Sequence, residues 1–256
     1  MRLGFIGTGK ISGALVEGFC TSSLRDSTIL LSPRNEETSA KLAKKYPQVH
    51  KAVSNQAVLD QSDILFIALR PAAAEAELKR LTFNERHTVI SLIPLLPFAA
   101  LSALTAPASV QCRAIPLPTV VTHRCPIPVY NAPDEVTRLL GYLGHPLPVA
   151  DERQLHALWT LTGLITPFYD LLDELSKWTT AHGVDAQTSA RYTADLFESL
   201  AFMASNEPDP IRFGALASHA ATPGGMNEQA GKEIREGGAH NTYLRAAEHL
   251  LERFEP

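Results

Sequence analysis

Three small residues near the start of the chain have the spacing of a phosphate-binding turn. Gly7, Gly9 and Ser12 follow a short apolar run, and apolar residues at helical spacing begin directly after them. Glycines at such a strand–turn–helix junction let backbone N–H groups approach a pyrophosphate without a Cβ in the way. Serine replaces the third glycine of the usual pattern, but it is small enough for close packing. The turn therefore predicts dinucleotide binding, and the alternative is a glycine turn without a ligand in another α/β protein.

The residues after the second expected strand indicate whether the dinucleotide is NAD or NADP. The run 28–31 is followed by Ser32 and Arg34, where a carboxylate would bind a ribose 2′-hydroxyl and repel a 2′-phosphate. An arginine with a small hydroxyl neighbour accommodates that phosphate instead. The sequence thus predicts NADP rather than NAD as the cofactor. The competing interpretation is that Arg34 is a solvated loop residue.

Further expected strands alternate with helical segments and must position these residues. Residues 63–69 form a continuous apolar run, which is typical of a central parallel strand buried on both faces. It ends at Arg70 and Pro71, which we expect to form a basic loop at the carboxyl edge of the sheet, where ligands of open α/β folds bind. Asn55 either caps the next helix or contacts the cofactor ribose. Other strands are expected at 49–53, 88–93, 110–115 and 146–149, with 125–130 as a short edge strand.

The sequence pattern changes at residue 151, where strand-like runs stop. Helices are expected at 151–178, 185–205, 210–220, 223–237 and 240–254. We therefore predict a Rossmann-type, doubly wound α/β domain over 1–150 and an all-helical domain over 151–256. The first two helices are apolar around much of their circumference, which favours burial against a second subunit. The expected assembly is a homodimer formed through the C-terminal helices.

The overall composition excludes several classes of partner. The 256 residues carry a net charge of −4, so no polycationic surface for nucleic acid or an anionic membrane is expected. Three cysteines without CxxC or Cys/His spacing suggest neither disulfides nor a metal site, and they favour the cytoplasm. The uncharged stretch 88–112 is long enough to cross a bilayer, but its prolines favour a strand, a loop and a short helix. A small-molecule ligand fits best.

Several motifs, in order, resemble those of the pyrroline-5-carboxylate reductase family over essentially the whole chain. The matching segments are GFIGTGKISGALVEGF, SDILFIALRP, CRAIPLP, LTGLITPFY and ATPGGMNEQAGKEIREGG. The most specific match is Thr222-Pro223-Gly224-Gly225 together with Gly231. The resemblance implies an NADP-binding domain, a helical domain that interleaves with its partner in a dimer, and reduction of a cyclic C=N bond.

The resemblance also assigns residues to the two sides of the site. The cofactor side would comprise Gly7, Thr8, Gly9, Lys10, Ile11, Ser12, Ser32, Arg34, Asn55, Ala68, Arg70 and Pro71. The substrate side would lie at the start of the helix at Pro223, facing the nicotinamide near Pro116. Its residues would be Pro116, Thr222, Gly224, Gly225 and Met226.

The departures from the family pattern fall on the substrate side. Family hydroxyls that hold the substrate carboxylate are replaced by Met226 and Asn227, and the asparagine after the Met-Pro pair is Leu117. The small Ser-Gly-Ser-Gly run becomes 163–166, which is more apolar. A buried carboxylate without partners costs several kcal/mol, so we expect a cyclic imine other than pyrroline-5-carboxylate.

The candidate proton donors for the imine nitrogen are Thr166, Tyr169 and Asn227. Tyr169 alternatively packs as an aromatic side chain, and Asn227 alternatively satisfies a helix end. Two other functions remain open. A reductase of the hydroxyacid dehydrogenase type would need a catalytic lysine, but Lys177 lies too near the end of its expected helix. A catalytically inactive NADP-binding sensor or partner protein would account for the lost hydroxyls.

Overall fold

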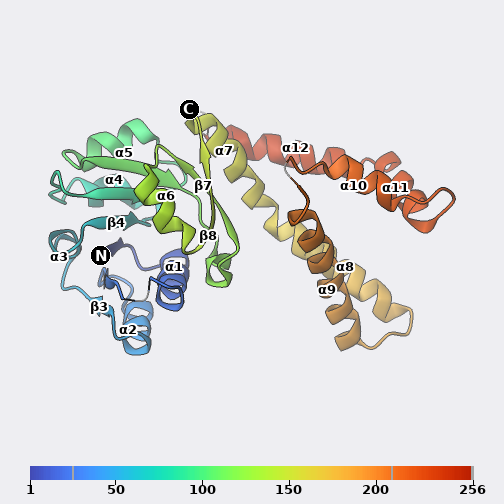
Figure 1. Cartoon of the computed structure of the whole chain (residues 1–256), viewed down its shortest axis with the longest axis horizontal. Coiled ribbons are helices and arrows are strands. Elements are labelled where there is room, and N and C mark those ends of the chain that lie inside the picture. The colour runs from blue at the N-terminus through green and yellow to red at the C-terminus, as the bar shows by residue number, and fades with distance from the viewer. Residues whose placement is uncertain (25, 209, 255–256) are drawn as a thin grey trace. The chain divides into compact units, whose positions relative to one another are not determined.

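The computed structural model describes residues 1–24, 26–208 and 210–254, and the chain divides into two compact units. The first unit is 1–159 and the second is 160–256 (Figure 1). The division falls nine residues after the predicted boundary at 150. Leu155 is fully buried in the first unit, and Glu152 accepts a hydrogen bond from the backbone N–H of Phe98 at 2.8 Å. The helix that follows residue 151 therefore packs largely with the sheet domain.

The first unit contains one eight-stranded sheet and its covering helices. Its strands are β1 (Arg2–Ile6), β2 (Thr28–Leu31), β3 (Val49–Lys51), β4 (Ile64–Ile67), β5 (Thr88–Ser91), β6 (Val110–Ala114), β7 (Cys125–Tyr130) and β8 (Gly144–Val149). Its helices are α1 (Lys10–Thr21), α2 (Glu36–Lys45), α3 (Asn55–Gln61), α4 (Pro71–Leu78), α5 (Phe98–Thr105), α6 (Asp134–Gly141) and α7 (Glu152–Thr160), with the 3-10 turn η1 (Pro118–Thr122).

The strand order is β3-β2-β1-β4-β5-β6-β7-β8, and every neighbouring pair is parallel except β6 and β7. The order reverses direction at β1, which pairs with β2 on one side and β4 on the other. The predicted Rossmann-type fold is thus confirmed. The prediction of an edge strand at 125–130 is wrong, because β7 lies between β6 and β8. Its prolines are tolerated since β7 shares only a short antiparallel register with β6.

Alternate side chains along the central strands enter two apolar layers. Phe5 and Phe66 stack with ring centroids 4.7 Å apart, and Phe19 of α1 tilts against Phe66 at 5.7 Å. This layer also contains residues of α2 and α6. The opposite layer joins Ile6 and Ile67 to residues of α3, α4 and α5. Burial on both faces explains why β4 has a continuous apolar sequence instead of an alternating one.

Two local predictions at the carboxyl edge of the sheet are corrected. Ser54, not Asn55, caps α3, and its side chain accepts a hydrogen bond from the backbone N–H of Ala57. Arg70 ends the loop 68–70 as the N-cap residue of α4, whereas Pro71 is not in the loop but is the first residue of that helix. Proline suits that position because its missing N–H would have no intrahelical partner there.

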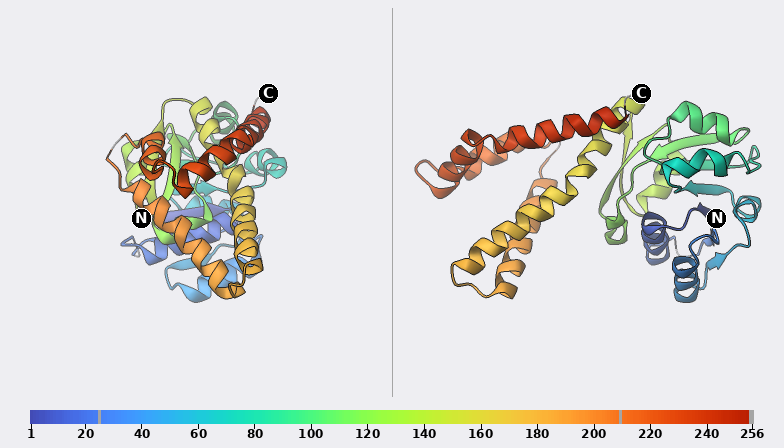
Figure 2. Two further views of the ribbon diagram at one scale, coloured as in Figure 1. Left: turned by 90° about the vertical axis from the view of Figure 1, so that its right-hand side faces the viewer. Right: turned by 180° about the vertical axis from the view of Figure 1, so that it is seen from behind.

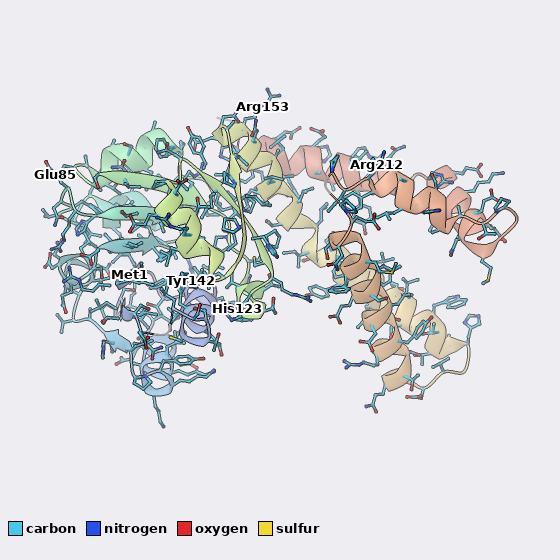
Figure 3. The ribbon with its side chains drawn as sticks, in the orientation of Figure 1. Met1, Glu85, His123, Tyr142, Arg153 and Arg212 are labelled. Carbon is cyan, nitrogen blue, oxygen red and sulfur yellow. The ribbon has the colours of Figure 1, made fainter. Side chains whose placement is uncertain are left out.

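His123, which has a positive φ, links the end of the first helix to the segment just before β8. His123 has φ 56° and ends η1. Its Nδ1 lies 2.9 Å from the carbonyl oxygen of Tyr142, and its Nε2 lies 3.2 Å from Oγ1 of Thr21 (Figure 3). These contacts link the last residue of α1 to η1 and to the residues just before β8.

The second unit is entirely helical. Its elements are η2 (Leu161–Leu164), α8 (Ile165–Ala181), α9 (Ala186–Ser205), α10 (Phe213–Ala220), α11 (Met226–Glu236), α12 (Ala239–Leu251) and η3 (Glu252–Phe254). The single helix predicted over 151–178 is therefore two helices separated by a 3-10 segment. Leu250 of α12 packs at Gly163, where an added Cβ would lie 2.5 Å from a Leu250 methyl carbon. The views in Figure 2 show α8 and α9 running side by side.

The second unit has no apolar core of its own. Among its described residues, only Thr160, Ser189 and Thr193 are buried. Eighteen large apolar side chains in this unit are exposed, compared with six in the larger first unit. A helical unit that leaves this much apolar surface in water is typical of one that buries it against a partner. Within the described residues, no helix combines the length and hydropathy needed to cross a membrane.

Candidate active site

The turn between β1 and α1 has the backbone that its glycines predict. Gly7 has φ +92°, and a Cβ there would lie 2.5 Å from the carbonyl oxygen of Ala68. Gly9 is the N-cap residue of α1, and no side chain caps this helix. A Cβ on Gly9 would meet no atom within 4 Å. The exposed N–H groups and open space at Gly9 fit the pyrophosphate of a dinucleotide.

Three hydroxyl side chains hold the turn in this shape. Ser32 Oγ accepts a hydrogen bond from the backbone N–H of Gly7 at 3.0 Å, and Thr8 Oγ1 donates to the Ser32 carbonyl at 3.0 Å. Ser12 Oγ donates to the Gly7 carbonyl at 2.6 Å. All three hydroxyl residues are buried. Ser32 Oγ therefore helps to hold the turn, and the assignment of Ser32 to the cofactor side stays a prediction.

Arg34 and Asn55, both predicted cofactor residues, are brought together by a residue that the sequence pattern did not indicate. Arg34 Nη1 lies 3.4 Å from Oε1 of Glu77, and Asn55 Nδ2 donates to Oε2 of Glu77 at 3.2 Å. Glu77 belongs to α4, after the next strand of the sheet. No local motif marks it, since its role depends on the folding of three separate βα units.

The remaining predicted cofactor residues lie at the same edge of the sheet. Ala68 directly follows β4, and its backbone N–H donates to the carbonyl of Ile6 at 2.8 Å. Arg70 and Pro71 then begin α4, and Pro116, a predicted substrate-side residue, follows β6. Because the carboxyl ends of parallel strands share one edge, the structure gathers the first-unit residues around the turn, as expected for a doubly wound sheet.

A cluster of charged side chains around the buried Arg113 lies next to this edge of the sheet. Arg113 on β6 is completely buried and forms an ion pair with Glu152, while its Nη1 also lies 2.9 Å from Nε2 of His156. Arg113 Nη2 donates to the carbonyl oxygen of Pro94 at 2.7 Å. Burial lowers the pKa of Arg113 from its ordinary value, and Glu152 opposes that change. Glu152 and His156 are four residues apart on α7, a spacing that places both on one face.

The segment before α11 forms a tight turn, and the carboxylate of Glu228 accepts a hydrogen bond from its backbone. Gly225 donates its N–H to the Thr222 carbonyl at 2.8 Å, and Gly224 has φ +70°. The N–H of Gly224 donates to Oε2 of Glu228 at 2.7 Å. Asn227 Nδ2 donates to the carbonyl of Ala220 at 3.1 Å, whereas Met226 is 87% exposed. The turn thus presents a thioether side chain and a carboxylate at the start of α11.

The three candidate proton donors are not gathered at one point within the chain. Thr166 and Tyr169 lie in the first turns of α8, which packs on α9. Asn227 belongs to α11, which packs on α12. Tyr169 is 61% exposed, and its ring centroid lies 5.4 Å from that of Phe168. Lys177 pairs with Asp173 and Glu174 on its own helix, so its ammonium is occupied by surface carboxylates.

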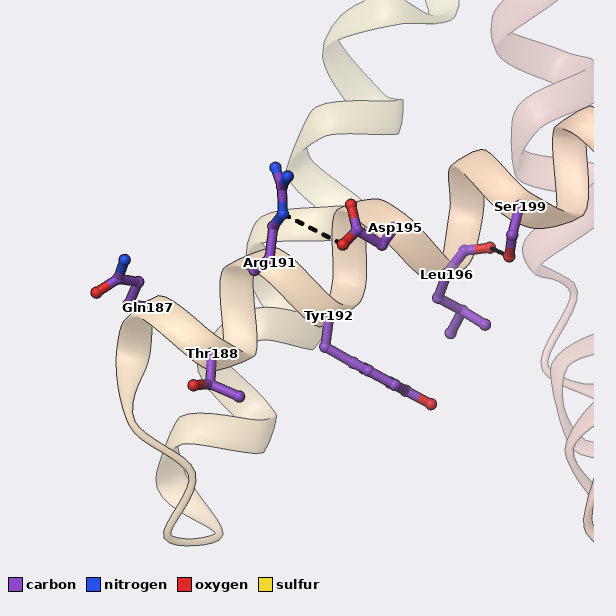
Figure 4. A pocket seen from close by; sticks show the side chains of 7 residues that line it. All are labelled: Gln187, Thr188, Arg191, Tyr192, Asp195, Leu196 and Ser199. Carbon is purple, nitrogen blue, oxygen red and sulfur yellow. Dashed lines mark hydrogen bonds and ion pairs between the residues drawn. The ribbon is translucent and has the colours of Figure 1, made fainter.

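The structure also contains three cysteines and a surface hollow on α9. All three cysteines are free thiols, and burial raises the pKa of Cys20 to about 11 and that of Cys112 to about 12. Neither is therefore a nucleophile at neutral pH. A shallow hollow on α9 contains Tyr192 and an ion pair between Arg191 and Asp195 (Figure 4), but none of the predicted site residues lines it. The residues that the structure describes contain no cluster suited to a metal ion.

Segments of both units match known protein families. Residues 2–94 match the family described as "NADP oxidoreductase coenzyme F420-dependent", and residues 152–255 match "Pyrroline-5-carboxylate reductase dimerisation". The pyrroline-5-carboxylate reductase of Corynebacterium melassecola is 24% identical over 98% of this chain and 96% of its own.

Solved structures share the fold. A 1-pyrroline-5-carboxylate reductase from Streptococcus pyogenes superposes with a TM-score of 0.84 at 18% identity, covering 100% of this chain and 98% of the other. A Plasmodium falciparum pyrroline carboxylate reductase with NADP bound gives 0.82 at 15% identity, covering 100% and 97%.

The glycine turn, the parallel sheet and the helical second unit define the class of NAD(P)-dependent reductases that join a Rossmann-type domain to a helical dimerisation domain. Within this class, the chain belongs to the pyrroline-5-carboxylate reductase family.

Proposed function

We propose that this chain is an NADPH-dependent reductase of cyclic imines whose substrate lacks the carboxylate of pyrroline-5-carboxylate. When bound, NADPH would supply a hydride, and a proton on the imine nitrogen would complete the reduction of C=N to an amine. The turn at Gly7 and Gly9 would bind the pyrophosphate, and Arg34 would contact the 2′-phosphate. Much of the rate in such a reaction comes from positioning, which asks little of acid–base groups.

The observation that carries the choice of substrate is the hydrogen bond from Gly224 to Glu228. In the family pattern, the segment after Pro-Gly-Gly holds a substrate carboxylate. In this chain the backbone N–H of Gly224 is already bound by the carboxylate of Glu228, at 2.7 Å. A second carboxylate would meet this negative charge and would lack the hydroxyls that Met226 and Asn227 replace. A neutral or cationic imine avoids both penalties.

We infer a homodimer, which the lack of an apolar core among the described residues of the second unit supports. No large apolar side chain described in 160–254 is buried, and the exposed ones include Leu200, Met203 and Phe213. Such a surface is favourably covered by the same surface of a second copy. The three free thiols are compatible with a reducing compartment such as the cytoplasm. Thr166, Tyr169 and Asn227 remain our candidates for the proton donor.

The test is turnover by the purified protein. NADPH oxidation is followed with pyrroline-5-carboxylate, with the corresponding five-membered imine without a carboxylate, with bulkier cyclic imines and with 2-oxoacids. We expect turnover of uncharged imines and at least about tenfold lower kcat/KM for the carboxylated one, equivalent to about 1.4 kcal/mol. Preference for 2-oxoacids would instead indicate a hydroxyacid dehydrogenase-like activity. Binding of NADPH without any turnover would indicate a sensor or partner protein.

Two variants on α11 sharpen this test. Glu228→Gln removes the negative charge at Gly224 but keeps an acceptor for its N–H, so the kcat/KM for the carboxylated imine should rise relative to that for the uncharged one. Glu233→Gln is the matched control, because Glu233 lies on the same helix and accepts from the side chain of Gln229 at 2.9 Å. Equal responses of the two substrates to Glu228→Gln would refute the substrate assignment.

A further inference from the structure

One carboxylate lies between two proposed cofactor residues that come from different βα units. Glu77 accepts from Asn55 through Oε2 at 3.2 Å and pairs with Arg34 through Oε1 at 3.4 Å. Its side chain is 24% exposed, whereas that of Arg34 is 66% exposed. The guanidinium is thus open to a ligand, and the carboxylate behind it is largely shielded.

This position has a chemical meaning in a Rossmann-type sheet. A carboxylate near the end of the second strand accepts a hydrogen bond from the ribose 2′-hydroxyl of NAD and repels the 2′-phosphate of NADP. Along the sequence, Ser32 and Arg34 occupy that position and favour NADP. In space, α4 brings Glu77 to the Arg34 guanidinium, so the edge of β2 carries a negative charge as well as a positive one.

We propose that Glu77 is a specificity-determining residue of the cofactor site, which weakens the preference for the 2′-phosphorylated dinucleotide and lets NADH bind as well. The proposal rests on the proposed function, because a dinucleotide must first bind at the turn. A carboxylate beside Arg34 offsets part of the attraction between its guanidinium and a phosphate dianion. A carboxylate has about four acceptor sites, so Glu77, whose side chain is 24% exposed, can accept from a ribose hydroxyl in addition to Arg34 and Asn55.

The opposite role, in which Glu77 merely holds Arg34 in place for the phosphate, is less consistent with the geometry. The two side chains meet through one nitrogen and one oxygen at 3.4 Å, not through a bidentate pair. Single contacts of this kind between partly exposed charges restrict a side chain only weakly. The stronger effect of Glu77 on a bound phosphate is then its charge.

The same helix offers a matched control. Glu75 also lies on α4, two residues earlier, but it pairs with Lys79 at 2.6 Å and its side chain is 67% exposed. Substituting Glu75 changes the net charge of the protein by the same amount without altering the contacts of Arg34. A difference between the two variants therefore reports the local position of the carboxylate and not the overall charge.

The experiment measures the dissociation constants of NADPH and NADH by fluorescence titration for the full-length wild type, Glu77→Gln and Glu75→Gln at one ionic strength. We expect Glu77→Gln to tighten NADPH and weaken NADH, which shifts the ratio of the two constants about fivefold or more towards NADPH. Glu75→Gln should leave the ratio unchanged. Arg34→Gln should shift it the other way, because it removes the cation that attracts the phosphate.

The outcomes separate the two proposals. An unchanged ratio in Glu77→Gln, or weaker NADPH binding, overturns the role of Glu77 while leaving the dinucleotide site intact. Failure of the wild type to bind either cofactor overturns the proposed function and this inference together. Thermal unfolding of each variant, with Glu77→Ala as a second substitution, shows whether a changed ratio accompanies a folded domain.

Discussion

Arg113 on β6 is completely buried and forms an ion pair with Glu152, in the first turn of α7. Glu152 also accepts the backbone N–H of Phe98, so one carboxylate joins the sheet, the start of α5 and the last helix of the first unit. The guanidinium has further acceptors in the carbonyls of Ile93 and Pro94. This arrangement explains why the compact unit extends to Trp159.

Removal of Glu152 should strongly destabilise the first unit. Glu152→Ala leaves the buried Arg113 without its counter-charge, and we expect a loss of about 3 kcal/mol in the free energy of unfolding. Urea unfolding monitored by circular dichroism measures it. Glu75→Ala is the control, because it breaks an exposed i,i+4 pair and should cost about 0.5 kcal/mol or less. Equal losses would show that the carbonyl acceptors suffice for Arg113.

Stability should fall as the pH is lowered below about 6.5, the ordinary value for histidine. Burial lowers the pKa of His87, and burial together with the charge of Arg113 lowers the pKa of His156. Each group is neutral when folded and takes up its proton more readily when unfolded. The stabilisation is therefore complete above pH 6.5 and is lost as the pH falls towards the folded pKa.

A His87 variant tests this pH dependence. His87 Nδ1 accepts the backbone N–H of Asn84 at 3.2 Å, and Nε2 lies 3.1 Å from the Leu59 carbonyl, so the neutral ring satisfies both contacts. His87→Gln keeps a donor for Leu59 and should reduce the slope of unfolding free energy between pH 6.5 and 5 by up to about 1.4 kcal/mol per pH unit. An unchanged slope in urea titrations would assign the dependence to other groups.

The two glycines of the turn should respond differently to alanine. Gly9→Ala places a methyl group in open space, so the fold should change by less than about 1 kcal/mol while NADPH binding weakens at least about tenfold. Gly7→Ala combines φ +92° with a contact 2.5 Å from the Ala68 carbonyl and should cost about 1–3 kcal/mol in stability. Calorimetric titration and thermal unfolding separate the effects. Normal NADPH affinity in Gly9→Ala would remove the turn from the site.

A charge on the apolar face of α9 should disrupt the proposed homodimer. Tyr192, Leu196, Leu200 and Met203 follow one another at helical spacing and are all exposed in the single chain. Leu200→Glu should shift the mass measured by light scattering from a dimer towards the 27.8 kDa chain, because a carboxylate in a buried interface is strongly unfavourable. Glu198→Gln, on the same helix, should not. A stable Leu200→Glu dimer would place the interface elsewhere.

The amino-acid sequence alone predicts the Rossmann-type turn, the mainly parallel sheet and the helical second unit. These depend on local patterns: glycine spacing at Gly7 and Gly9, a continuous apolar run in β4, and apolar residues at helical spacing. Two predictions made from local patterns are wrong: the single helix over 151–178 and the edge strand at 125–130. The 3-10 segment at 161–164 and the internal position of β7 depend instead on packing against residues distant in sequence.

The contacts between charged groups, by contrast, are visible only in the folded chain. Glu77 reaches Arg34 across 43 residues, and Arg113 reaches Glu152 across 39, so no periodicity links either pair. Ser32 shows the same dependence on the fold, because its hydroxyl accepts the N–H of Gly7, 25 residues away in the sequence. Electrostatic and hydrogen-bond partners depend on distance in space, whereas apolar periodicity depends on position along the chain. The cofactor-binding turn is thus encoded locally, and the charge that surrounds it is assembled by the fold.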